Sequence, residues 1–215
     1  MSLPERTCLD CPSCGAIVEM TRWTSVNTAL DPDVARALLD GSLTAYRCVC
    51  GHEGNVDHDV LFHDPVRRQM IQVAVGDLEA TRGALLHAFE GTAGFGEHLH
   101  ASLATRVVRS RGGLVEKVRL AAAGLDDRVW EALVALLARE PGGLQGRTIA
   151  FEGVDGDALF VTARDGDRAT FSFSRGPYDE LAASLAAAGA LGPTEPWAVV
   201  DRGWATALFA RLASD

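Results

Sequence analysis

Apolar and polar positions first indicate short elements in residues 16–62. Residues 16–27 and 56–62 carry apolar side chains at roughly alternate positions, which is typical of half-buried strands. Between them, Asp31, Pro32 and Asp33 predict the start of a helix, because Asp31 can cap it and Pro32 fits its first turn. Gly41 is placed to end this helix, which we expect from Pro32 to Asp40. The chain therefore begins with two hairpin-like arms and a helix between them.

The apolar spacing becomes helical between residues 67 and 140. Apolar residues at positions 75, 78, 85, 86 and 89 fall on one helical face. Two further helices are predicted at 114–123 and 126–139, separated by Gly124, whose tolerance of a positive φ suits a helix end. The helix at 126–139 has apolar side chains on more than one face, so we expect it to be central and mostly buried.

The pattern changes again after residue 147. Residues 148–151, 158–163 and 169–174 predict three strands, the last two joined by a tight turn at residues 165–167. A helix at 178–188, a short strand at 197–200 and a last helix at 202–212, capped by Asp201, follow. We expect two domains, residues 1–66 and 67–215. The second has helices to about residue 140, antiparallel strands at about 147–175 and C-terminal helices.

Composition narrows the class of protein. The chain has 215 residues, of which 47% are apolar and 23% charged, as in an ordinary globular protein. No run approaches the length of a membrane span, and no secretion signal is present, so we expect a cytoplasmic protein without membrane contact. The formal charge of −9 argues against a broad basic face for nucleic acid.

The cysteines carry the strongest chemical signal. All five lie in the first 50 residues, so they serve one local purpose, which in a reducing compartment is usually metal binding. A Cys-x-x-Cys turn presents two thiolates to one tetrahedral ion. A second pair with one intervening residue follows, and each pair ends in Cys-Gly. The sequence therefore predicts Zn²⁺ bound by four thiolates: Cys11, Cys14, Cys48 and Cys50.

Two variations of this ligand set remain open. Cys8 lies three positions before Cys11 and is a candidate to replace one of the four cysteines, and His52 is another. Four thiolates close the coordination sphere and quench Lewis acidity, so the predicted ion is structural and no catalytic residue is assigned. We expect metal binding to stabilise the fold of residues 8–63.

Several motifs in order resemble the CpXC family of bacterial proteins, which is named for its Cys-Pro-x-Cys sequence. They are Cys11-Pro12-Ser13-Cys14-Gly15, Trp23-Thr24-Ser25-Val26-Asn27, Asp31-Pro32, Leu39-Asp40-Gly41, Cys48, Cys50-Gly51, Leu61-Phe62-His63-Asp64-Pro65, Leu114-Val115-Glu116-Lys117-Val118 and Gly124-Leu125-Asp126-Asp127-Arg128-Val129. The resemblance implies zinc binding and adds no reaction, because the family's function is unassigned. The short second pair departs from a Cys-x-x-Cys expectation, which is why Cys8 stays a candidate.

The predicted fold class is α+β, with an N-terminal zinc-ribbon-like unit containing an inserted helix, a helical middle, and a C-terminal antiparallel meander with helices. The leading functional hypothesis is a protein without enzymatic activity, whose structural zinc shapes a surface for an unknown macromolecular partner. A homo-dimer through the apolar helix at 126–139 is a further hypothesis.

Two rival functions remain. The first is a metal-dependent or His/Asp-dependent enzyme with a site between the two halves, using His63, Asp64 and Asp127. The second is a zinc ribbon that binds nucleic acid through a local basic patch around Arg47, Arg67 and Arg68, although the acidic net charge argues against it.

Overall fold

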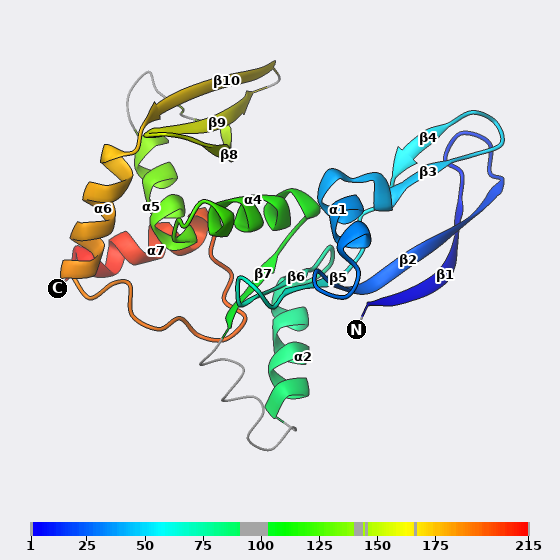
Figure 1. Ribbon diagram of the computed structural model, residues 1–215, viewed down its shortest axis with the longest axis horizontal. Coiled ribbons are helices and arrows are strands. Elements are labelled where there is room, and N and C mark those ends of the chain that lie inside the picture. Colours follow the sequence, from blue (N-terminus) through cyan, green and yellow to red (C-terminus); the bar gives the residue numbers. More distant parts are fainter. Residues whose placement is uncertain (1, 91–102, 140–143, 145, 166, 215) are drawn as a thin grey trace. The chain divides into compact units, whose positions relative to one another are not determined.

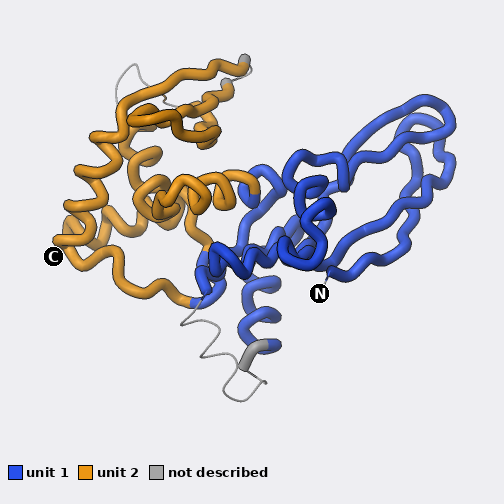
Figure 2. Tube along the Cα trace, viewed as in Figure 1, with its two compact units in different colours: residues 1–114, 196–198 blue, residues 115–195, 199–215 orange. Residues whose placement is uncertain are grey.

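The computed structural model describes residues 2–90, 103–139, 144, 146–165 and 167–214. The chain forms two compact units (Figure 2). Unit 1 comprises residues 1–114 and 196–198, and unit 2 comprises residues 115–195 and 199–215. Unit 1 therefore contains the whole predicted metal-binding segment, residues 1–66, together with the strands that follow it. No helix among the described residues has the length and apolar character needed to cross a membrane.

A five-stranded sheet forms the centre of unit 1. Its strands are β1 (Leu3–Asp10), β2 (Ile17–Asn27), β5 (Val60–Asp64), β6 (Gln69–Val73) and β7 (Ala104–Val108), in the order β1-β2-β5-β6-β7. β1 pairs antiparallel with β2, and β5 pairs antiparallel with β6, whereas the β2–β5 and β6–β7 pairs are parallel. Val26, Phe62, Ile71 and Val107 are at most 1% exposed, so this part of the sheet carries the core of unit 1.

Only one end of the β1–β2 hairpin pairs with the rest of the sheet. β2 pairs with β5 only at residues 25–27, whereas it pairs with β1 from Ile17 to Ser25. A second, two-stranded sheet consists of β3 (Ala45–Arg47) and β4 (Glu53–Asn55). The β1–β2 and β3–β4 hairpins point in the same direction, away from β5, β6 and β7 (Figure 1).

The helix between the arms has the predicted bounds. α1 runs from Pro32 to Asp40 and ends at Gly41, whose φ of +92° is left-handed. The expected capping role of Asp31 is wrong, because its side chain makes no cap hydrogen bond. The turn before the helix is instead held by Asn27, whose Oδ1 accepts the amides of Ala29 and Leu30. A short 3-10 helix, η1 (Ser42–Thr44), leads into β3.

The middle of the chain is less helical than the sequence pattern predicts. Helix α2 is limited to Leu78–Glu90, and Val75 lies outside it and is 49% exposed. Residues 69–73 and 104–108 form β6 and β7 instead, and all five residues of β6 are buried. A short strand buried on both faces has no alternation, so periodicity cannot distinguish it from a piece of buried helix. The strand expected at 197–200 amounts to one parallel bridge between Arg106 and Ala198.

Unit 2 is built around helix α5 (Asp127–Leu137), which is mostly buried as predicted. It follows α4 (Arg111–Ala122) after Gly124, whose φ is +68°. Strands β8 (Thr148–Asp155), β9 (Ala158–Asp165) and β10 (Asp167–Ser174) form an antiparallel meander, and α6 (Gly176–Ala187) and α7 (Arg202–Leu212) complete the unit. This confirms an α+β protein with the predicted C-terminal meander.

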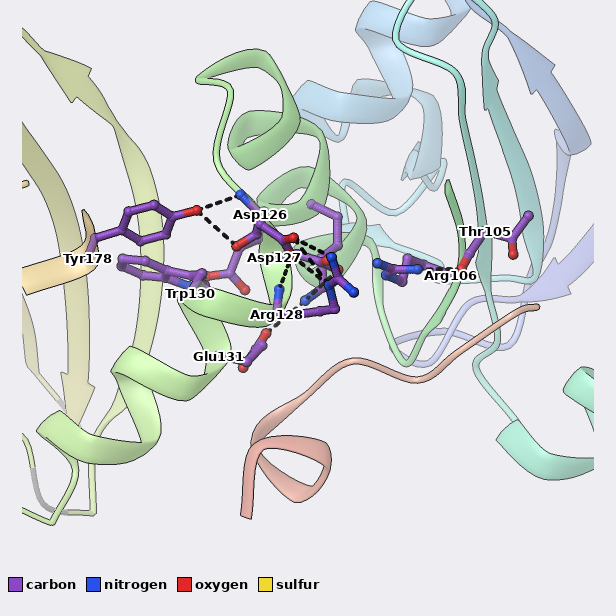
Figure 3. Close-up of polar contacts among 10 residues, drawn as sticks. Thr105, Arg106, Asp126, Asp127, Arg128, Trp130, Glu131 and Tyr178 are labelled. Atoms are coloured by element: carbon purple, nitrogen blue, oxygen red, sulfur yellow. Dashed lines mark hydrogen bonds and ion pairs between the residues drawn. The ribbon is translucent and has the colours of Figure 1, made fainter. Parts of the chain in front are cut away.

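Side chains of α5 join the layers of unit 2. Trp130 meets Phe151 of β8 edge to face, with ring centroids 5.3 Å apart. Asp126 caps α5 by accepting the amide of Arg128, and its own amide donates to the hydroxyl of Tyr178 on α6 over 2.6 Å (Figure 3). Asp201 caps α7 by accepting the amide of Trp204, as the sequence predicts.

Candidate metal centre

Four cysteine sulfurs meet where the two hairpins of unit 1 turn. Cys11, Cys14, Cys48 and Cys50 place their Sγ atoms within 4.8 Å of one another. The Cys11–Cys50 and Cys14–Cys48 sulfur pairs are 3.8 and 3.6 Å apart. A tetrahedral ion with metal–sulfur bonds of about 2.3 Å requires sulfurs about 3.8 Å apart. The cluster therefore has the dimensions of a four-thiolate metal site, and these separations are far longer than a disulfide bond.

The two loops that carry the cysteines have similar backbones despite their different spacing. In the loop between β1 and β2, Cys11 N–H donates to the carbonyl of Ala16, and Gly15 N–H donates to that of Cys11. In the loop between β3 and β4, Cys48 N–H donates to the carbonyl of His52, and Gly51 N–H donates to that of Cys48. A second pair with one intervening residue can therefore still present both thiols on one side of a closed turn.

Each of the two turns ends at a glycine with a left-handed backbone. Gly15 has a φ of +73° and Gly51 a φ of +88°, a region that costs a residue with a Cβ about 1–2 kcal/mol. We expect Gly51→Ala to lower the free energy of unfolding of unit 1 by about 1 kcal/mol and to weaken metal binding. Gly76→Ala is the matched control, because its φ is not left-handed and its Cβ would meet nothing within 4 Å. Chemical denaturation and a competitive zinc titration of both variants measure the difference.

Backbone amides point at all four sulfurs. Ser13 and Cys14 donate to Cys11, Ala16 donates to Cys14, Cys50 donates to Cys48, and His52 donates to Cys50. Such donors stabilise a thiolate, which is the form that binds metal. The glycine that follows each cysteine pair is the sequence signal of the turn that directs these amides.

The thiols divide into two that ionise easily and two that do not. The amide of His52, together with the thiols of Cys14 and Cys48, lowers the pKa of Cys50 to about 7. Burial raises the pKa of Cys11, but the amides of Ser13 and Cys14 outweigh burial and lower it. The pKa of Cys14 rises to about 12, because the neighbouring thiols outweigh the amide of Ala16. Adjacent thiolates repel one another, so a divalent cation would favour loss of the remaining protons.

The structure places Cys8 and His52 outside the sulfur cluster. Cys8 is exposed on β1, opposite Glu19 of β2. The ring of His52 faces Tyr46, with centroids 6.0 Å apart, and the residue supports the cluster only through its backbone. Among the described residues, three or more potential ligands lie close enough to share one ion only in the cluster of the other four cysteines.

The histidines that follow the second cysteine pair hold the sheet together. His58 is buried, and its Nε2 lies 3.1 Å from the carbonyl of Trp23 on β2. His63 places Nδ1 3.0 Å from Nδ2 of Asn27, so its ring orientation is set by an amide of β2 and not by Asp64. Burial is the main cause that lowers the pKa of His63. The described residues assemble no second metal site from these histidines.

Asp64 closes the turn between β5 and β6. Its side chain accepts the amides of Val66 and Arg67 at 3.1 Å and the guanidinium of Arg67 at 2.9 Å. The residue is 2% exposed, and burial raises the pKa of its carboxyl, but the donors of Arg67 outweigh burial and lower it. These contacts indicate that the Asp64 carboxylate has a structural role. Asp127, the third residue of the enzyme hypothesis, pairs with Lys117 in unit 2 over 3.4 Å.

Removing the Asp64 carboxylate tests this structural role. We expect Asp64→Ala to cost about 1–3 kcal/mol, because two amides and a guanidinium lose their acceptor. A lowered folded pKa means that the stabilisation is present above the ordinary pKa of 3.8 and is lost as the pH falls through the folded value. The difference from wild type in urea denaturation should therefore shrink below about pH 4. A difference that stays constant to pH 2 would contradict this account.

Two of the three arginines proposed as a nucleic-acid patch form ion pairs with acidic residues, and the third makes a backbone hydrogen bond. Arg47 lies 3.4 Å from Glu53, with both side chains exposed, and Arg67 binds Asp64. Arg68 has a left-handed φ of +53°, and its carbonyl accepts the amide of Ala104 in β7. Each guanidinium of Arg47 and Arg67 is therefore partly neutralised before any phosphate approaches.

The comparisons with known proteins agree with the cysteine geometry. The family model described as CpXC protein matches residues 9–134, more than half of the chain. This segment contains both cysteine pairs and continues through α4 into α5. No curated protein and no solved structure matches the chain. With a family match of this extent, the chain belongs to the CpXC family.

Proposed function

We propose that the four cysteines hold one Zn²⁺ ion as a closed structural site, and that this ion shapes a surface to which another macromolecule binds. The observation that carries the proposal is the sulfur cluster itself, with separations of 3.6 and 3.8 Å and a backbone amide at each sulfur. Four thiolates would complete a tetrahedral shell, leaving no position for a substrate or a water molecule.

The location of the cluster supports a structural role. One cysteine pair ends the β1–β2 hairpin and the other ends the β3–β4 hairpin, so a bound ion would cross-link two separate sheets. Neither hairpin has a large core of its own, since β1 is mostly exposed and β3 and β4 have three residues each. An ion at this point would therefore replace the apolar packing that short hairpins lack.

Zinc fits the donors better than other common ions. Tetrahedral sulfur ligation selects zinc or iron, whereas magnesium and calcium require oxygen ligands. Elemental analysis of protein purified without added metal distinguishes zinc from iron directly. One zinc per chain supports the proposal. Iron, recognised by a visible charge-transfer band, would contradict it and would indicate an electron-transfer centre. Metal-free protein that takes up no added zinc would overturn the proposal.

The partner is proposed to be a protein and not a nucleic acid. The formal charge of −9 repels polyanions, and Arg47 and Arg67 already face carboxylates. We also propose a cytoplasmic location, since reduced thiols are needed to bind the ion. The rival enzyme hypothesis gains no support from its residues, because Asp64 is fully engaged by its turn and His63 is held by Asn27.

A further inference from the structure

The outer edge of β2, the edge that faces away from β1, carries backbone groups at residues 17–21 that pair with no other strand among the described residues. Cys11 N–H donates to the carbonyl of Ala16, which fixes the alternation of hydrogen bonds along the β1–β2 hairpin. The opposed pairs that exchange hydrogen bonds are then Leu9–Val18, Thr7–Met20 and Glu5–Arg22. The residues between them on β2, namely Ile17, Glu19 and Thr21, direct their N–H and C=O groups away from β1.

Two observations support this assignment. Pro4 lies opposite Trp23, in the set that makes no bonds across the hairpin, where its missing N–H costs nothing. The carbonyl of Trp23 meets His58 Nε2 at 3.1 Å, on the side away from β1. Since β5 pairs with β2 only at residues 25–27, the outer edge at residues 17–21 is left open within the described part of the chain.

A cavity of about 410 Å³ borders this edge. Its walls come from β2 on one side and from the end of α1, η1 and β3 on the other, and they include Thr21, Trp23, Leu43 and Tyr46. Trp23, Leu43 and Tyr46 are half-buried, so they offer apolar surface that is only partly covered. The volume is within the range of about 300–1,000 Å³ that is typical of ligand sites.

The opposite wall also offers an open strand edge. Cys48 N–H donates to the carbonyl of His52, and Val56 N–H donates to that of Thr44, so Tyr46 and Gly54 form the bonded pair between them. The N–H and C=O groups of Arg47 therefore face away from β4, and Arg47 lines the cavity. Free amide and carbonyl groups in a row, beside apolar side chains, are the chemistry that recognises an extended peptide.

We propose that this groove, defined by the outer edge of β2 (residues 17–21) and the cavity lined by Trp23, Leu43 and Tyr46, binds an extended peptide segment of a partner protein by strand addition. One apolar side chain of the peptide enters the cavity, and its backbone pairs with Ile17, Glu19 and Thr21. The peptide is neutral or basic, because the chain carries a net charge of −9 and Glu19 lines the groove, while Arg47 on the other wall already pairs with Glu53. The inference rests on the proposed function, since the zinc cross-link fixes the distance between the two walls.

The test begins with a phage-displayed library of random short peptides, selected on the zinc-loaded full-length chain. Selected peptides are synthesised, labelled, and titrated by fluorescence anisotropy. The key variant is Thr21→Pro, which removes one outward amide without disturbing the bonds to β1. The matched control is Arg6→Pro, which removes the outward amide of the residue opposite Thr21, on the free edge of β1. Zinc content and thermal unfolding verify that both variants fold.

We expect Thr21→Pro to weaken peptide binding about tenfold and Arg6→Pro to leave it unchanged. N-methylation of alternate peptide amides should abolish binding to the unaltered protein, which tests strand pairing even if Thr21→Pro fails to fold. Equal binding by both variants, tolerance of N-methylation in both registers, or a library that yields no binder would overturn the inference. If the protein forms dimers that Thr21→Pro dissociates, the groove binds a second copy of this chain, and the inference is overturned.

Chelation separates failure of this inference from failure of the proposed function. If peptides bind at the groove equally well with and without zinc, the groove is real but zinc does not shape it. If binding requires zinc and is insensitive to Thr21→Pro and to N-methylation, the zinc-shaped surface lies elsewhere on the chain. Loss of binding on chelation, together with sensitivity to Thr21→Pro, supports both proposals.

Discussion

Cys11→Ser is expected to remove the metal and to unfold the two hairpins of unit 1. Cys11 is 2% exposed and lies 3.8 Å from Cys50 within the cluster. A serine hydroxyl cannot replace its thiolate, because protein zinc sites use thiolate, imidazole or carboxylate ligands. Zinc binding is worth about 10–16 kcal/mol in zinc-finger peptides, and most of this depends on a complete ligand set. The expected loss is therefore large compared with the total stability of a domain of ordinary size.

The effect should be confined to the part of unit 1 that the proposed ion would cross-link. Hydrogen exchange is expected to accelerate by orders of magnitude at residues 3–24 and 45–55, which form the hairpins, and much less in β5, β6 and β7. The core of those three strands consists of apolar side chains such as Phe62, Ile71 and Val107, which lie outside the cysteine cluster. Exchange monitored by mass spectrometry, with zinc content measured on the same sample, decides the outcome.

Cys8→Ser is the matched control for this experiment. Cys8 is an exposed thiol in the same hairpin, outside the cluster, so its replacement should leave both zinc content and hydrogen exchange unchanged. If Cys8→Ser loses the ion and Cys11→Ser keeps it, the ligand set is different from the one proposed. If both variants keep one zinc per chain and exchange like wild type, the ion lies elsewhere and the structural role is wrong.

Lys117→Met is expected to destabilise unit 2 by about 3–5 kcal/mol at neutral pH. Lys117 on α4 is 3% exposed and lies 2.9 Å from Glu131 and 3.4 Å from Asp127, both on α5. Methionine retains the volume of the side chain but removes the cation that pairs with the buried Glu131 carboxylate. A buried charge without its partner is far more costly than a buried pair.

The pH dependence of this loss has a definite sign. Burial raises the pKa of Glu131 above its ordinary 4.5 and outweighs the opposing effect of Lys117, so removal of Lys117 should raise it further. A group with a raised folded pKa stabilises the fold below its unfolded value and loses that contribution as the pH rises through the folded value. The deficit of Lys117→Met should therefore be largest at neutral pH and shrink toward pH 4.5. Urea denaturation at several pH values measures it.

Arg119→Met provides the control on the same helix. Arg119 pairs with Glu152, but its side chain is 43% exposed, and exposed pairs contribute about 0–1 kcal/mol. A loss in Lys117→Met no larger than that in Arg119→Met would contradict the importance of burial. Lys117 itself has a raised pKa, because its carboxylate partners outweigh burial, so in wild type its contribution should persist through neutral pH and disappear only above its ordinary 10.5.

Elements with strong local signals were predictable from the sequence. Helices α1 and α7 have the predicted bounds, because a proline at the first turn, a glycine stop and the Asp201 cap act within one turn of chain. The meander of unit 2 was equally predictable, since turn-forming residues separate its strands in the sequence. Asp31 shows the limit of such signals, because a capping residue in sequence need not cap when Asn27 already holds the turn.

Strands β6 and β7 were not predictable by the same reasoning. Both are five residues long and largely buried, so neither shows the alternation of a half-exposed strand. β6 pairs with β5 across the short turn at residues 65–68, but its other partner, β7, follows only after α2. Which sheet a short apolar segment joins is settled by long-range hydrogen bonds that no local pattern encodes.

The sequence by itself determined which chemistry this protein carries: five cysteines in 50 residues, two glycine-ended turns, and the helices whose caps are local. Only the tertiary structure decided which four sulfurs meet, that Cys8 stays apart on β1, that Lys117 lies between two acids, and that an open strand edge borders a cavity. The physical reason is range. Residue type and turn geometry act over a few positions, whereas ligand sets, buried charge pairs and free strand edges depend on packing between segments that are distant in the chain.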